Sequence, residues 1–154
     1  MAAYFLDSSA LVKAYRQEIG TAWTRGIMSP ASRNDLYVAH ICGAEVVAAI
    51  VRQQRAGNLS GPDAVLALTR FKTDFARDLL IVATDSAVIG NAMRMIEKHG
   101  LRGYDGVQLG SALHLHQARR AASLPDLTFL SADKNLTGTA SAETLIVDDP
   151  NLHP

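Results

Sequence analysis

Residues 4–12 read YFLDSSALV, an apolar run that ends at a single aspartate and continues through two serines. The run predicts a buried strand that carries Asp7 at its end, with a helix following at once. Open α/β sheets bind their ligands beyond the carboxyl ends of the strands, so Asp7 is placed where such sites form. One carboxylate does not make a site, and the rest of the sequence must supply its partners.

The remainder of the chain repeats this alternation of apolar runs and helical patterns. Four further runs predict strands, at residues 36–39, 79–83, 127–132 and 144–147. Helical patterns separate them, at residues 43–56, 60–78, 84–100 and 104–122. Strands that alternate with helices favour parallel pairing, so we expect an α/β fold, a three-layer α/β/α sandwich with a mainly parallel central sheet. The patterns do not determine the order of the strands.

Composition predicts one compact domain over residues 1–154. The chain has 154 residues, of which 48% are hydrophobic, enough for a single core. Fifteen basic residues balance fifteen acidic ones, so any binding of nucleic acid must come from a local patch. The single cysteine, Cys42, excludes an internal disulfide, and no apolar run is long enough to span a membrane. We therefore expect a cytoplasmic protein with no membrane association.

Three more acids are placed to reach the edge of the sheet where Asp7 lies. Asp133 ends the fourth predicted strand as Asp7 ends the first, and Glu45 and Asp105 fall in the first turns of two predicted helices. Each acid alone could simply cap a helix or interact with its dipole. Four independent caps, however, would have no reason to share one location.

Carboxylates gathered in one crevice need a cation. Two unit charges ~4 Å apart repel by about 4 kcal/mol at an effective dielectric of ~20. A set of oxygen ligands without cysteine suits a hard ion, Mg²⁺ or Mn²⁺, and such ions commonly handle phosphate groups.

Four blocks of the sequence, in order, resemble the motifs of the PIN domain family. They are FLDSSALVKAY (5–15), AEVVAAI (44–50), LRGYDGVQLGSAL (101–113) and FLSADKNL (129–136). The likeness covers nearly the whole chain, and it is greatest to the compact VapC-type toxins of bacterial toxin–antitoxin pairs. The acidic residues of those toxins align with Asp7, Glu45, Asp105 and Asp133.

This resemblance implies a metal-dependent endoribonuclease that cleaves RNA. The four acids would be both catalytic residues and ligands of Mg²⁺ or Mn²⁺, with Ser9 and Asn135 in supporting roles. The resemblance also implies a homodimer and a cognate antitoxin, which would place a basic side chain against the carboxylates. Lys13 and Arg16 follow the first acid and could contact RNA phosphate, but a solvated helix face explains them better, so neither is placed in the site.

Two other functions remain open. A haloacid-dehalogenase-like phosphatase also begins from an aspartate at a strand end, and the pair Asp148 and Asp149 would supply late acids. That family needs a second aspartate where this chain has Ser9, so the pair is better explained as a solvated turn. A non-catalytic PIN-like module that only binds RNA or protein is the second alternative, although such a module would be expected to have lost one or more of the acids.

Overall fold

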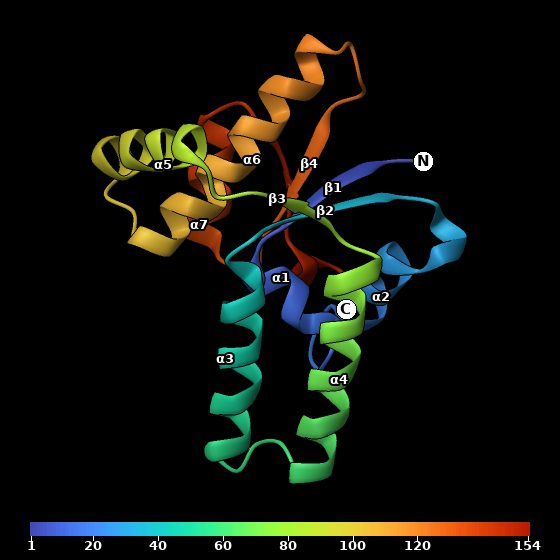
Figure 1. Ribbon diagram of the computed structural model, residues 1–154. Helices are drawn as coiled ribbons and strands as arrows, with labels where there is room; N and C mark the ends of the chain where they lie inside the picture. The colour runs from blue at the N-terminus through green and yellow to red at the C-terminus, as the bar shows by residue number, and fades with distance from the viewer.

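The fold is built on five parallel strands, as a computed structural model of residues 1–154 describes (Figure 1). The strands are β1 (Ala3–Leu6), β2 (Asp35–Ala39), β3 (Leu80–Val82), β4 (Leu127–Leu130) and β5 (Ile146–Asp148). Their order across the sheet is β3-β2-β1-β4-β5, and every neighbouring pair is parallel. The predicted α/β class is confirmed, and each predicted strand lies within two residues of an observed one.

Seven α-helices and three short 3₁₀ helices connect the strands. The α-helices are α1 (Ser8–Leu11), α2 (Thr21–Met28), α3 (Cys42–Arg55), α4 (Gly61–Arg77), α5 (Ser86–His99), α6 (Gly103–Ala121) and α7 (Lys134–Ala142). The 3₁₀ helices are η1 (Val12–Ala14), η2 (Pro30–Ser32) and η3 (Pro150–Leu152). The four longest helices match the predicted ranges, while α2 carries no strong sequence signal. None of the helices combines the length and the apolar character needed to cross a lipid bilayer.

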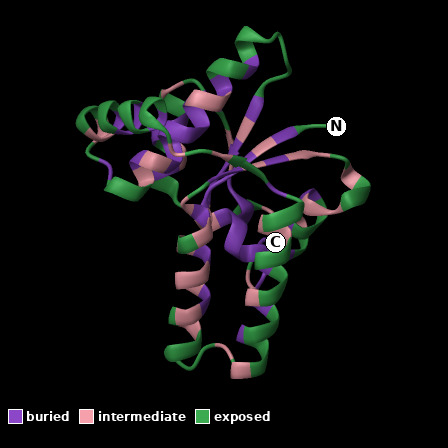
Figure 2. Ribbon diagram, viewed as in Figure 1, coloured by how far each residue is buried: buried purple, intermediate pink, exposed green.

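The helices form two layers, one on each face of the sheet. Successive side chains of a strand point to opposite faces, so Leu6 packs with α1, α3 and α4, while Phe5 packs with α6 and α7. Figure 2 shows the resulting burial, concentrated on the strands and on the helix sides that face them. Helices α3 and α4 extend from the first layer as a long hairpin (Figure 1).

Two glycines allow α5 and α6 to pack closely, and this packing fixes the start of α6. A Cβ atom on Gly110 would lie 2.8 Å from the backbone nitrogen of Ala92. A Cβ atom on Gly106 would come still closer to the Ile96 side chain. The first turn of α6, which carries Asp105, is therefore held against α5.

The order in which strands are added to the sheet reverses between β1 and β4. β2 and β3 are added on one side of β1, and β4 and β5 are added on the other side. Residues 6 and 130 are register partners, so the segments that leave β1 and β4 diverge from neighbouring points at the carboxyl edge. Such a switch point is the usual ligand site of an open parallel sheet.

Candidate active site

Asp7 lies at the switch point, and three donors hold its carboxylate. It is 3% exposed and caps α1, because Ala10 N donates to Oδ1 at 2.9 Å. Ser9 Oγ donates to Oδ1 at 2.7 Å, and Ser131 Oγ, from the segment after β4, donates to Oδ2 at 2.8 Å. Asp7 can therefore cap α1 and also take part in a site, because the carboxylate that caps the helix is bound by Ser131 as well.

Burial raises the pKa of Asp7 from its usual 3.8 to about 6. The hydrogen bonds from Ala10, Ser9 and Ser131 act in the opposite direction, and the charge of Glu45 raises the pKa further. A buried carboxylate of this kind binds a proton readily, and a cation at the same place would relieve the same penalty.

Glu45 follows β2, in the first turn of α3, and is joined to α6 by Gln108. Gln108 Nε2 donates to Glu45 Oε2 at 2.5 Å and to Cys42 Sγ at 3.1 Å. Burial raises the pKa of Glu45, with the charge of Asp105 contributing in the same direction and the hydrogen bond from Gln108 opposing it. Sequence reasoning missed Gln108, and the only signal was its position three residues after Asp105 on the same helix face.

Asp105 and Asp133 extend the series of acids. Burial, and then the charge of Asp133, raise the pKa of the half-buried Asp105, while Arg102 lowers it. Asp133 is exposed and caps α7, because its Oδ1 accepts from Asn135 N at 2.8 Å and from Leu136 N at 3.2 Å. Asn135 contacts Asp133 through its backbone, and its side-chain amide makes no hydrogen bond to any of the acids.

The four acids are coupled in series through their charges, a series called the row below, and they do not form a tight cluster. The charge of Glu45 raises the pKa of Asp7, and the charge of Asp105 raises the pKa of Glu45. In the same way, the charge of Asp133 raises the pKa of Asp105. No three His, Cys, Asp or Glu side chains lie close enough together to form a ready-made set of ligands. The row suits an ion such as Mg²⁺, which keeps several of its waters and takes only one or two carboxylates directly.

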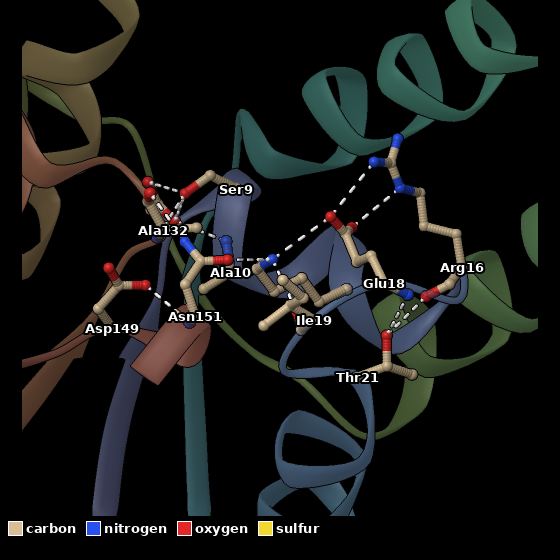
Figure 3. A network of polar contacts seen from close by, with 11 residues as sticks. Ser9, Ala10, Arg16, Glu18, Ile19, Thr21, Ala132, Asp149 and Asn151 are labelled. Carbon is tan, nitrogen blue, oxygen red and sulfur yellow. Dashed lines mark hydrogen bonds and ion pairs between the residues drawn. The ribbon is translucent and has the colours of Figure 1, made fainter. Parts of the chain in front are cut away.

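A second network ties the segment after β4 to the C-terminal 3₁₀ helix (Figure 3). Ser9 Oγ accepts from Ala132 N at 2.9 Å, and Ala132 O accepts from Asn151 Nδ2 at 3.3 Å. Asn151 Oδ1 in turn accepts from Lys13 Nζ at 2.8 Å. The position of the segment that carries Asp133 thus depends on side chains from both ends of the chain.

Lys13 is neither exposed nor available to RNA, contrary to both expectations. It is 3% exposed, and its ammonium group also donates to Ile19 O at 2.9 Å and pairs with Glu18 at 3.3 Å. Asp149, expected in a solvated turn, is also buried and caps η3 by accepting from Asn151 N at 2.8 Å. Both residues therefore have structural roles.

The C-terminal turn is also fastened by an aromatic stack. Trp23 of α2 lies parallel to His153, with ring centroids 4.0 Å apart and an interplanar angle of 2°. His153 Nε2 lies 2.9 Å from Asp148 Oδ1, which connects the stack to β5.

A groove next to the row of acids is lined mainly by apolar side chains. Its volume is about 670 Å³, and it runs between α1 and α3 past Ser9, Glu45 and Arg52 to Tyr104. The acids therefore adjoin a surface of the size that small-ligand and peptide sites use.

Comparison with known proteins gives matches in structure but not in sequence. No family model matches the sequence, and no curated protein matches it. The fold is similar to that of PAE2754 from Pyrobaculum aerophilum, with a TM-score of 0.65 and 15% identity, covering 98% of this chain and 85% of that one. It is also similar to a toxin–antitoxin complex from Klebsiella pneumoniae, with a TM-score of 0.62 and 13% identity over 96% and 98% of the two chains.

A third similar structure is VapC20 of Mycobacterium tuberculosis, described as a toxin that cleaves the sarcin–ricin loop. Its TM-score is 0.60 at 11% identity, and the match covers 99% of this chain and 100% of that one. At these identities the likeness establishes the fold. The PIN-like α/β/α architecture of VapC toxins, expected from the four sequence blocks, is confirmed for this chain.

Proposed function

We propose that the chain is a divalent-metal-dependent endoribonuclease, the toxin of a type II, VapBC-like toxin–antitoxin pair. The observation that carries the proposal is the row of coupled carboxylates, which begins with Asp7 at the β1–β4 switch point. Burial raises the pKa of three of its four members, which is the electrostatic state expected of acids assembled to receive a cation.

The donor set fits Mg²⁺ or Mn²⁺. Asp7, Glu45, Asp105 and Asp133 offer only carboxylate oxygens, and the nearby Cys42 thiol is buried and bonded to Gln108. A bound divalent ion would polarise the scissile phosphate and lower the pKa of a water molecule.

The chain's own residues would orient the acids and keep them ionised. Ser9 and Ser131 donate to the Asp7 carboxylate and so favour its charged form against the cost of burial. Gln108 does the same for Glu45. We propose that Asn135, whose side chain is exposed beside Asp133, supports a water molecule or the RNA rather than a carboxylate.

The proposed partners are an RNA substrate, an antitoxin and a second copy of the chain, all in the cytoplasm. One similar structure is described as a toxin–antitoxin complex, which supports an antitoxin here. A guanidinium group can satisfy the charge that the ion satisfies, so we propose that the antitoxin places an arginine against the row. The homodimer rests on the resemblance to VapC toxins.

A non-catalytic binding module is the second candidate. The observation in its favour is that no three potential metal ligands lie close together in the structure. Against it, all four acids are present and electrostatically coupled. The phosphatase alternative is disfavoured by Ser9, which stands where that family needs a second aspartate and donates a hydrogen bond to Asp7.

The test is cleavage of a fluorescently labelled single-stranded RNA by wild type and by Asp7→Asn. Wild type should cut with Mg²⁺ or Mn²⁺ and stop in excess EDTA, and Asp7→Asn should be inactive while remaining folded by circular dichroism. Asp85→Asn is the matched control, because Asp85 caps α5 as Asp7 caps α1 but lies outside the row. Cleavage that survives EDTA would contradict the proposal, and a wild type that binds RNA but never cuts it would favour the binding module.

A further inference from the structure

A large pocket lies at the opposite edge of the sheet from the acids. Its volume is about 650 Å³, within the range typical of small-ligand sites. Leu36 near the start of β2 and Leu79 just before β3 line it, so it faces the amino ends of the strands. The acids follow the carboxyl ends, which makes this pocket a separate place on the molecule.

Four arginines from three separate segments converge on this pocket. Arg25 comes from α2, Arg33 follows η2, and Arg70 and Arg77 come from α4. None of these four guanidinium groups lies within 4.0 Å of a carboxylate oxygen. In a chain whose net charge is zero, the pocket therefore concentrates unpaired positive charge.

One of the four guanidinium groups is held in place. Arg25 Nε donates to Ala14 O at 2.8 Å, which anchors the guanidinium group and leaves both terminal nitrogens without a partner. An arginine anchored in this way has lost part of its side-chain entropy before any ligand arrives, which favours binding.

The two aspartates in the pocket offset only part of the charge of the four arginines. Asp74 Oδ2 accepts from Tyr15 OH at 2.8 Å, so part of its hydrogen-bonding capacity is already used. Asp78 is exposed at the end of α4 and makes no side-chain hydrogen bond. Four cationic groups face two anionic ones, and the imbalance remains.

We propose that this pocket binds a phosphate-bearing ligand of nucleotide size. Guanidinium groups bind phosphate oxygens through paired hydrogen bonds, and several unpaired arginines suit a group with more than one negative charge. Met28, Leu36 and Leu79 supply an apolar floor against which a base could lie. The ligand is either a free nucleotide or the phosphorylated end of an RNA, which share this chemistry.

The competing explanation is a solvated helix face. Arg70 and Arg77 are exposed on α4, and charged residues on such a face commonly contact only water. That explanation does not account for the anchored Arg25, and it predicts no saturable binding. The two explanations therefore differ in a measurable way.

The experiment is isothermal titration calorimetry in EDTA, which prevents binding through a metal ion at the acids. The probes are ADP, adenosine, and one RNA trinucleotide with and without a 5′-phosphate. We expect one ADP per chain and no binding of adenosine. Arg70→Gln and Arg77→Gln should each weaken the binding of ADP about tenfold, the effect of losing one charged hydrogen-bond partner.

Two matched variants serve as controls. Arg55→Gln removes an exposed arginine at the end of α3 that does not line the pocket, and Asp7→Asn removes an acid from the row. Both should bind ADP as wild type does, whether or not the chain proves to be a ribonuclease. If the 5′-phosphorylated RNA binds tighter than ADP, the ligand is an RNA end, and the reverse order identifies a free nucleotide.

Two results would overturn the proposal. One is the absence of binding by both ADP and the phosphorylated trinucleotide. The other is an equal loss of affinity in Arg55→Gln and Arg70→Gln, which would mean that the anion responds to overall charge and not to the pocket.

Discussion

Ser131 Oγ donates a hydrogen bond of 2.8 Å to Asp7 Oδ2 and so joins the segments that leave two neighbouring strands. Ser131 is fully buried, so water does not compete for this bond. Of the donors to Asp7, Ser131 is the one that comes from β4's side of the switch point. The electrostatics of Asp7 therefore depend on the pairing of β1 with β4.

Ser131→Ala should raise the pKa of Asp7 further above about 6. The hydrogen bond stabilises the charged carboxylate, and its loss leaves the penalty of burial less opposed. The measurement is titration of the Asp7 carboxyl carbon by NMR. Ser86→Ala, at an exposed position in α5, should leave this pKa unchanged, and an unchanged value in Ser131→Ala would show that the bond does not form in solution.

Asp7 should make the metal-free protein less stable as the pH rises from 4 to 7. Its pKa is about 6 in the fold and near 3.8 in the unfolded chain, so the folded state binds the proton more tightly. The contribution to stability is complete below the unfolded value and is lost as the pH passes through the folded one. The loss amounts to about 3 kcal/mol, at 1.36 kcal/mol per pKa unit.

The measurement is urea unfolding of wild type and Asp7→Asn in EDTA across this pH range. The free energy of unfolding of wild type should fall relative to that of the variant, because the variant has no proton to lose at this position. Saturating Mg²⁺ should reduce the fall at pH 7, because an ion that binds only the folded state stabilises it. If the free energies of unfolding of wild type and Asp7→Asn change with pH in parallel in EDTA, the assigned pKa of Asp7 is wrong.

Neutralising Asp105 should raise the melting temperature of the metal-free protein. Burial and the charge of Asp133 disfavour the ionised form of Asp105, so Asp105→Asn removes an unfavourable charge. Solvent screens this half-exposed group, and a rise of roughly 2 °C is expected. In saturating Mg²⁺ the advantage should disappear, because wild type gains more from the ion. Asp85→Asn should leave the melting temperature unchanged both without metal and in saturating Mg²⁺, since asparagine caps a helix about as well as aspartate.

Gly110→Ala should destabilise the protein by about 1–3 kcal/mol, the usual cost of forcing extra volume into a packed interface. The added methyl group would meet the backbone of α5, which cannot rotate away as a side chain can. Gly90→Ala on α5 is the matched control, because its Cβ atom would meet nothing within 4 Å. That substitution should be neutral or stabilising, as alanine favours helix. Urea unfolding of both variants measures the difference.

The strands and acids were predictable because their signals are local. An apolar run with an aspartate after it identifies the end of β1 directly, and that of β4 to within three residues, without any knowledge of the remaining chain. The neighbouring position of these two strands was not predictable, because it depends on pairing between residues more than a hundred positions apart. Asp7 and Asp133 therefore had candidate roles from sequence, but their common location needed the structure.

Buried polar residues were the least predictable part of the site. Lys13 is a charged residue in a short helix, and only its acceptors at Ile19 and Asn151 explain why it is buried. Gln108 has no motif of its own, and its importance arises from its contact with Glu45 on another helix. In both cases the partner lies on a separate element, where no pattern of spacing reveals it.

The stacking of Trp23 on His153 gives the molecule its own optical reporter. Trp23 is the only tryptophan in the sequence, so all of the indole fluorescence comes from the surface on which the C-terminal turn rests. Asn151 of that turn contacts Ala132, next to Asp133. A change in indole emission would therefore follow the departure or return of this turn in real time and without an attached dye.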